Sequence, residues 1–236
     1  MNRLFKLFLL PFFAACSFNE QNDSANGFKN ELTTMLKSQI ISRGITNQRV
    51  LAAIKSVPRH KFVPKEIQEF AYEDRPLPIG FNQTISQPFI VAAMTQAIAP
   101  QPHEKILEIG TGSGYQAAIL AQLSTNVYSI EIIPELADRA KKTLNEIGIT
   151  NVYIKCDDGF NGWKEYAPFD AIIVTCAPDA IPQPLINQLA DNGRIIIPVG
   201  GNYGQELIKV TKKDGKLISE KLMNVIFVPM TGKAQK

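Results

Sequence analysis

Three glycines and a neighbouring carboxylate have the types and spacing of a nucleoside-binding loop. Gly110, Gly112 and Gly114 follow a short apolar run that ends around Glu108. Glycines at such a position let the backbone turn tightly and let a ligand approach it closely. The spacing is G-x-G-x-G, with Tyr115 where a dinucleotide-binding loop needs its third glycine, and the sequence holds no Gly-Lys-Ser/Thr phosphate loop. The loop therefore favours a nucleoside that is neither a dinucleotide nor ATP.

Further carboxylates follow the next two apolar runs. Glu131 stands about 20 residues after the loop, where a carboxylate can accept two hydrogen bonds from a ribose diol. Asp157, Asp158 and Gly159 follow the next run, and Asp158 and Gly159 are expected to face an adenine. Taken singly, Glu131 could be a solvated residue at a helix start and the Asp-Asp pair a turn. Together, with no basic phosphate clamp, they favour a nucleoside with positive charge, such as S-adenosylmethionine.

The elements that must position these residues alternate between strand and helix. Strands are predicted at 105–109, 127–130, 152–154, 169–175 and 194–199, with helices at 115–123, 134–147 and 181–189 between them. Two further strands, 206–210 and 216–228, flank a Lys-Asp-Gly turn and should pair with each other. This pattern predicts an α/β fold with a doubly wound, Rossmann-like sheet that is mostly parallel and has an antiparallel C-terminal edge.

A helical preface precedes the sheet. Apolar residues at helical spacing predict one helix over 28–42, stopped by Gly44, and a second helix capped by Asn47 and ended by Pro58. Residues 58–88 are rich in Pro and Gly and are predicted to form a long loop, which inside a compact domain is usually functional. No change in composition follows residue 27, so 28–236 is predicted to be one domain.

The first 27 residues differ in character from the rest. Arg3 and Lys6 precede an apolar run at 7–13, and Ala-Ala-Cys16 follows, so residues 1–16 resemble a signal peptide with a lipobox. Residues 17–27 are polar and are predicted to form a linker. This pattern predicts export or a membrane tether through Cys16. The alternative is an amphipathic N-terminus or one read from the wrong start.

Composition excludes several classes of function. The chain has 236 residues, 45% of them hydrophobic, which excludes a wholly disordered protein. Its formal net charge is +3, too weak for binding dominated by nucleic-acid phosphates. Its two histidines and three cysteines show no zinc-ligand spacing. We therefore expect neither nucleic acid nor a metal as a ligand.

Longer segments resemble known families. The stretch 108–115, EIGTGSGY, is similar to the first motif of class I methyltransferases that use S-adenosylmethionine. The stretch 77–95, LPIGFNQTISQPFIVAAMT, looks like the signature of protein-L-isoaspartate O-methyltransferases, and four other segments do so too: 57–64, 167–189, 193–200 and 225–232. The resemblance covers roughly residues 30–232. The glycine motif is shared by many methyltransferases, so the family assignment depends on the more restricted stretch 77–95.

The resemblance implies an activity. That family methylates the free carboxylate of L-isoaspartyl residues in damaged proteins, and the ester then returns to a succinimide that can reopen as normal aspartate. It implies S-adenosylmethionine as the cofactor, no metal, damaged proteins or peptides as partners, a monomer, and a cytoplasmic location. Two alternatives stay open: a related class I methyltransferase with another substrate, and an envelope lipoprotein that only binds a ligand.

The resemblance also implies roles for individual residues. Ser86 matches the active-site serine of the family and would orient the substrate carboxylate, although alone it could be a serine at a turn or helix start. Thr84 and Ile85 would contact the damaged chain through their backbones, and Val228 and Thr231 would close the pocket. Gly110, Gly112 and Gly114 would approach the methionine end of the cofactor, with Glu108 beneath them. The short, basic C-terminus, GKAQK, departs from the family pattern.

Overall fold

The computed structural model describes residues 27–201 and 204–235. The signal-like segment 1–16, with Cys16, lies outside the described residues, and so does the predicted linker except Gly27. Within them one mixed sheet has the strand order β5-β4-β3-β6-β7-β8-β9. The strands are β3 (Lys105–Ile109), β4 (Asn126–Glu131), β5 (Val152–Cys156), β6 (Phe169–Val174), β7 (Leu189–Val199), β8 (Gln205–Lys213) and β9 (Lys216–Val225).

The sheet has the predicted architecture. The five neighbouring strands β5, β4, β3, β6 and β7 pair in parallel, and β8 and β9 add the antiparallel edge. Ile106 and Leu107 are neighbours in β3 whose side chains point to opposite faces of the sheet, and both are fully buried. Ile106 belongs to a core with α4 (Pro88–Ile98) and α5 (Tyr115–Ala121), and Leu107 to a core with α7 (Gln183–Asn187). The doubly covered α/β sheet is therefore confirmed.

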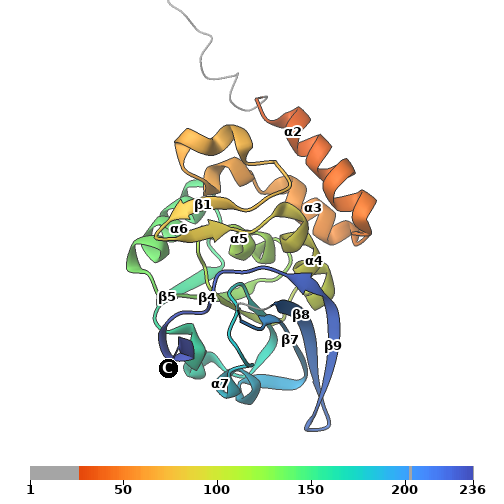
Figure 1. The fold of residues 1–236 in the computed structure, drawn as a ribbon, viewed down its shortest axis with the longest axis vertical. Coiled ribbons are helices and arrows are strands. Elements are labelled where there is room, and N and C mark those ends of the chain that lie inside the picture. Colours follow the sequence, from red (N-terminus) through yellow and green to blue (C-terminus); the bar gives the residue numbers. More distant parts are fainter. Residues whose placement is uncertain (1–26, 202–203, 236) are drawn as a thin grey trace, which may run out of the picture.

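The N-terminal elements form a cap beside the sheet (Figure 1). The helix α2 (Lys29–Thr34) continues as a π-helix over Met35–Ile40 and a 3-10 turn over Ile41–Arg43, and left-handed Gly44 ends it as predicted. The helix α3 (Gln48–Ser56) follows, and the Asn47 side chain caps it by accepting the N–H groups of Arg49 and Val50. None of the described helices combines the length and the apolar character needed to cross a bilayer.

The predicted long loop at 58–88 has more structure than expected. It contains 3-10 turns at Arg59–Phe62 and Lys65–Phe70 and an antiparallel hairpin of β1 (Leu77–Gly80) and β2 (Gln83–Ile85). The hairpin strands are only four and three residues long, and one contains Pro78. Such short strands show too little alternation to be read from sequence.

Several other predicted boundaries were wrong: the strand predicted at 194–199 begins at Leu189, and the strand predicted at 206–210 spans Gln205–Lys213. The predicted helix 181–189 ends at Asn187, because Leu189 already pairs with Phe169 as the first residue of β7. The predicted strand 216–228 ends at Val225. Beyond it the chain returns across the sheet edge, where Ala177 exchanges backbone hydrogen bonds with Val228 and Met230. This return brings the C-terminal segment, residues 226–235, to the carboxyl ends of the parallel strands.

The strand order creates a crevice at those carboxyl ends. The chain runs from β3 outward through β4 to β5 and returns to place β6 on the other side of β3. The connections after β3 and β6 therefore leave in opposite directions and open a gap between them, which is where ligands bind in open α/β sheets.

Candidate active site

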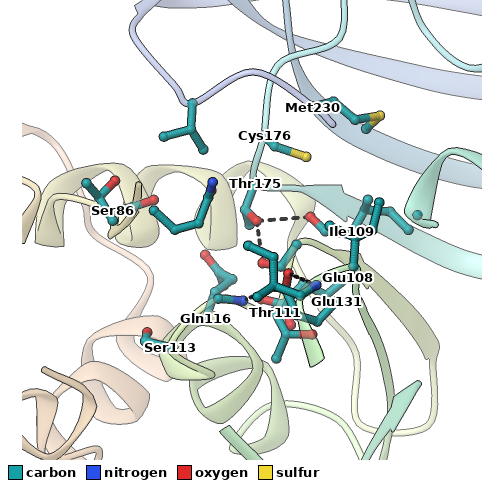
Figure 2. Close-up of a pocket in the computed structure, with 18 of the residues that line it drawn as sticks. Ser86, Glu108, Ile109, Thr111, Ser113, Gln116, Glu131, Thr175, Cys176 and Met230 are labelled. Carbon is teal, nitrogen blue, oxygen red and sulfur yellow. Dashed lines mark hydrogen bonds between the residues drawn. The ribbon is translucent and has the colours of Figure 1, made fainter. Parts of the chain in front are cut away.

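A cleft lies at this switch point and encloses about 790 Å³, part of it open to solvent. Its walls come from the glycine loop, the ends of β4 and β6, the β2 segment and the C-terminal segment (Figure 2). Ten residues with predicted roles line it: Thr84, Ile85, Ser86, Glu108, Gly110, Gly112, Glu131, Gly159, Val228 and Thr231. Gly114 and Asp158 are not among the lining residues.

The glycine loop is held tightly against the end of β6. Gly110 has φ +92°, and a Cβ added there would lie 2.5 Å from Thr175 Oγ1. That hydroxyl is within hydrogen-bond distance of the carbonyls of Ile109 (2.9 Å) and Gly110 (2.6 Å). Gly114, by contrast, packs against Ala140 of α6 (Pro134–Glu146). The first glycine thus shapes the cleft, whereas the third allows close helix packing.

Glu131 connects the glycine loop to the start of α6. Its side chain is buried, with 5% exposed. The Gly112 N–H donates to Oε2 (2.7 Å), and the Ile133 N–H donates to Oε1 (3.0 Å). A carboxylate oxygen can accept more than one hydrogen bond, so both oxygens keep capacity for a diol on the cleft side.

Glu108 supplies a buried carboxyl group beneath the loop. It is fully buried, Ser129 donates a hydrogen bond to its Oε2, and Ser129 also pairs with Thr111 (2.6 Å). Within the described residues its Oε1 has no hydrogen-bond partner. Burial raises the pKa of Glu108 to about 8, the Ser129 hydrogen bond opposes this rise, and the nearby charge of Glu131 adds to it. Without a ligand this carboxyl group is therefore mostly protonated at neutral pH, and a positively charged ligand group beside it would favour its ionised form.

The β1–β2 hairpin brings Ser86 to the side of the cleft that lies opposite Glu108 and Glu131. Figure 2 shows Ser86 and Met230 on opposite sides of Thr175. The Ser86 carbonyl accepts a hydrogen bond from the buried Arg59 Nη2 (2.7 Å). The Ile79 carbonyl in β1 accepts one from Arg139 of α6. Two cations from outside the hairpin thus fix where the Ser86 segment lies.

Asp158 links the turn after β5 to the C-terminal segment. Its Oδ1 accepts the Phe160 N–H (2.9 Å) and caps the turn at 159–161. Its Oδ2 accepts the Lys233 N–H (2.9 Å). Both oxygens of Asp158 therefore accept hydrogen bonds from the backbone, while the neighbouring Gly159 lines the cleft.

Comparison with known proteins identifies the family. A protein-family model described as protein-L-isoaspartate(D-aspartate) O-methyltransferase matches residues 29–235. The chain belongs to this family.

Individual relatives agree with this assignment. The protein-L-isoaspartate O-methyltransferase of Gloeobacter violaceus is 54% identical over 198 residues, which are 84% of this chain and 97% of that protein. The one from Methanoculleus marisnigri is 50% identical over 208 residues, covering 88% of this chain and 94% of that protein. The resemblance read from 77–95 is thereby confirmed, and so is the enzyme class: the chain is a methyltransferase.

Solved structures of the same family share the fold. A protein-L-isoaspartate O-methyltransferase superposes with a TM-score of 0.78 at 28% identity, covering 87% of this chain and 66% of that one. A Plasmodium falciparum protein of this kind, in complex with S-adenosyl-L-homocysteine, gives a TM-score of 0.76 at 27% identity over 84% of this chain and 97% of that one.

The cleft fits the cofactor of the protein-L-isoaspartate O-methyltransferase family. The family uses S-adenosylmethionine as its methyl donor. The buried Glu108 carboxyl, which a neighbouring cation would ionise, suits the positive charge of S-adenosylmethionine, and the buried carboxylate of Glu131 suits its ribose diol. Gly110 leaves no room for a side chain where the backbone meets the cleft. Within 27–201 and 204–235 no three His, Cys, Asp or Glu side chains are grouped as a metal site would need.

Sequence reasoning missed part of the cleft wall. Thr111, Gln116, Thr175, Cys176 and Met230 also line it. Thr175 and Cys176 directly follow β6, so their place at the end of a central apolar strand was the available signal. Burial raises the pKa of the Cys176 thiol to about 12, so this residue presents a neutral thiol to the cleft. Met230 reaches the cleft only through the return of the chain after β9, which no local pattern announces.

Proposed function

We propose that this cleft methylates the free carboxylate of L-isoaspartyl residues in damaged proteins, with Ser86 orienting that carboxylate. The observation that carries the proposal is the convergence of two segments that are far apart in sequence. The Ser86 segment, with Thr84 and Ile85, lines the same cleft as Gly110 and Glu131. A protein that only bound a nucleoside would have no need of a serine-bearing hairpin held on a buried arginine.

The substrate supplies its own nucleophile. A carboxyl group has a reference pKa of about 4, so the isoaspartyl carboxylate is ionised at neutral pH and needs no general base. S-adenosylmethionine, when bound, supplies a methyl group on a positively charged sulfur. The task of the protein is to hold one carboxylate oxygen in line with that methyl group. Orientation of two reactants contributes about 7–11 kcal/mol in favourable cases.

The assignments divide the cleft between two ligands. On the cofactor side, Glu131 takes the ribose diol, Glu108 supports the methionine end beneath Gly110 and Gly112, and Gly159 faces the adenine. Gly114 shapes the loop from behind by its contact with Ala140. Asp158 faces the adenine beside Gly159, and its two oxygens also accept the backbone N–H groups of Phe160 and Lys233.

On the substrate side, the Ser86 hydroxyl donates to the isoaspartyl carboxylate. Thr84 and Ile85 contact the damaged chain through their backbones, because β2 lies at the free edge of a two-stranded hairpin. Val228 and Thr231 close the opposite wall. Their position depends on the hydrogen bonds that Ala177 and Asp158 make with the C-terminal segment.

We further propose that the enzyme acts as a monomer in the cytoplasm, where S-adenosylmethionine is made. The signal-like segment with Cys16 argues for the envelope instead. Cell fractionation with and without globomycin decides between these locations. A precursor that accumulates in the presence of globomycin would establish lipidation at Cys16 and contradict the cytoplasmic proposal.

The deciding experiment uses the full-length protein and two peptides of one sequence, one with isoaspartate and one with normal aspartate. Transfer of a labelled methyl group only to the isoaspartyl peptide is the expected result. Transfer to neither peptide, with S-adenosylmethionine still bound by calorimetry, would indicate a related methyltransferase with another substrate. No binding of the cofactor at millimolar concentration would contradict the enzymatic proposal and favour the envelope alternative.

A further inference from the structure

Arg59 is a buried cation directly behind the Ser86 segment. Its side chain is fully buried in the 3-10 turn Arg59–Phe62. Nε donates to the carbonyl of Ala71 (2.7 Å) and Nη2 to the carbonyl of Ser86 (2.7 Å). Within the described residues Nη1 has no hydrogen-bond partner. Arg59 thus holds the backbone of Ser86 without lining the cleft itself.

The charge of Arg59 is not balanced by a carboxylate. None of the ion pairs between described residues includes Arg59. Its guanidinium lies 4.8 Å from the ring centre of Tyr115, and Tyr72 is the other ionisable group that acts on it. Fully buried arginines are ordinarily paired, since an isolated buried charge is costly. An unpaired one at this position therefore needs a functional reason.

The guanidinium nevertheless stays charged. Burial lowers the pKa of Arg59 to about 10, and the neighbouring Tyr115 opposes that change. Burial raises the pKa of Tyr72 to about 12, so this phenol is neutral at physiological pH and offers no compensating charge. At neutral pH the protein therefore keeps one full positive charge behind the Ser86 segment.

We propose that Arg59 is a positioning residue for the reacting carboxylate: its buried, unpaired charge makes the cleft prefer an anion over a neutral group beside Ser86. This inference rests on the proposed function, which puts the isoaspartyl carboxylate at Ser86. The missing counter-charge of Arg59 is then supplied by the substrate. The hydrogen bond from Nη2 also occupies the Ser86 carbonyl, whose partial negative charge would otherwise be free to repel that carboxylate.

The charge acts on binding rather than on the transfer step. During transfer the carboxylate oxygen forms a bond to the methyl carbon and loses its negative charge, while the bond from that carbon to sulfur breaks and sulfur keeps the electron pair. A fixed positive charge therefore stabilises the carboxylate substrate more than the transition state or the neutral ester. Arg59 should therefore lower the KM of the peptide without raising kcat, and it should favour release of the neutral ester.

The test compares a charged and a neutral ligand of nearly the same shape. Binding of two peptides to the full-length protein with S-adenosylhomocysteine is measured by calorimetry: one peptide has the isoaspartyl α-carboxylate, and the other has an α-carboxamide in its place. The wild type should prefer the carboxylate. In Arg59→Met both peptides should bind more weakly, because the Ser86 carbonyl loses its hydrogen bond from Nη2. The preference for the carboxylate should in addition fall about tenfold, about 1.4 kcal/mol. Steady-state kinetics should show a raised KM with a smaller change in kcat.

Other outcomes separate the two proposals. Equal weakening of both peptides in Arg59→Met would overturn the inference, because a purely structural role predicts it. A wild type that binds neither peptide would contradict the proposed function instead. If Arg59→Met fails to bind S-adenosylhomocysteine, Arg59→Lys decides. The pKa of a buried lysine is lowered, to about 5–6 in documented cases. The carboxylate preference of this variant should therefore weaken as pH rises from about 5 to about 9.5, and a preference that does not change over this range overturns the inference.

Discussion

The two sides of the cleft are built in different ways. On the cofactor side, neighbouring strand ends hold the site through backbone hydrogen bonds: Gly110 N–H donates to Ile130 (2.8 Å) and Thr175 N–H to Ile109 (2.9 Å). On the substrate side, the β1–β2 hairpin and the C-terminal segment lie outside the seven-stranded sheet. Single side chains, Arg59, Arg139 and Asp158, hold them, together with one pair of backbone hydrogen bonds between Ala177 and the C-terminal segment.

This difference has a consequence for how variants behave. The position of the cofactor side follows from strand order and register, and many backbone hydrogen bonds together fix that register. The position of the substrate side depends on a few buried or partly buried contacts from distant parts of the chain. We therefore expect cofactor-side variants to impair binding and turnover together, and substrate-side variants to spare cofactor binding.

The largest effect is expected from Gly110→Ala. The added Cβ would lie 2.5 Å from Thr175 Oγ1 at a left-handed φ. Either Thr175 turns away and loses its hydrogen bonds to the Ile109 and Gly110 carbonyls, or the ends of β3 and β6 separate. Affinity for S-adenosylmethionine, measured by calorimetry, should fall on the order of a hundredfold or more. Gly148→Ala is the matched control: Gly148 also has a left-handed φ but open space around it, so this variant should keep its affinity. Affinity of Gly110→Ala within threefold of wild type would contradict the packing described for β3 and β6.

The second-largest effect is expected from Glu131→Ala. It removes the acceptor for the Gly112 and Ile133 N–H groups together with the proposed ribose contact. A charge-assisted hydrogen bond contributes about 1.5–3 kcal/mol, so the dissociation constant of S-adenosylmethionine should rise roughly ten- to hundredfold. Glu135→Ala, at an exposed position in the first turn of α6, should change it less than twofold. An unchanged constant in Glu131→Ala would remove this residue from the site.

Glu108 makes stability on the cofactor side depend on pH. Its pKa of about 8 in the folded protein lies above the ordinary value of 4.5, so the folded state binds the extra proton and the unfolded state does not. Stability from this group is complete below about pH 4.5 and is lost as pH rises through 8. Between pH 6 and pH 8 the free energy of unfolding of the ligand-free protein should fall by on the order of 2 kcal/mol. Glu108→Gln should lack that fall in urea titrations, and a parallel fall in the variant would rule out Glu108 as its source.

Ser86→Ala tests the substrate side directly. The variant loses one hydrogen-bond donor to a charged carboxylate, so kcat for the isoaspartyl peptide should fall about tenfold. The dissociation constant of S-adenosylmethionine should stay within twofold, because no cofactor-side contact of Ser86 is expected. Equal losses in turnover and cofactor affinity would break the division between the two sides.

The same division explains what could be read from the sequence. The carboxylates at 108 and 131 and the glycines before α5 follow strands whose order obeys general topological rules, so their gathering at one edge was predictable. The hairpin was missed, because β2 is only three residues long and its position depends on Arg59 and Arg139. Chain reversals such as the one that brings Met230 to the cleft depend on long-range contacts, which no local pattern encodes.

The adenine contact of Asp158 stays a prediction. Its place after β5 predicted an adenine contact, yet its oxygens accept the N–H groups of Phe160 and Lys233. A carboxylate beside a turn bonds nearby backbone donors readily, and the sequence spacing cannot distinguish that use from ligand binding.

The smallest effect is expected from Asp158→Ala, which loosens the link between the two sides. The free energy of unfolding should fall by about 1 kcal/mol, as for loss of a capping residue. The C-terminal segment, with Val228 and Thr231, would lose the anchor at Lys233, so the KM of the isoaspartyl peptide should rise about threefold. Affinity for S-adenosylmethionine should fall by about threefold or less, since the proposed adenine contact is one of several on the cofactor side. Asp157→Ala, at the exposed neighbour, is the control and should leave KM unchanged. A tenfold loss of cofactor affinity with an unchanged KM would instead assign Asp158 to the adenine and make it part of the cofactor side.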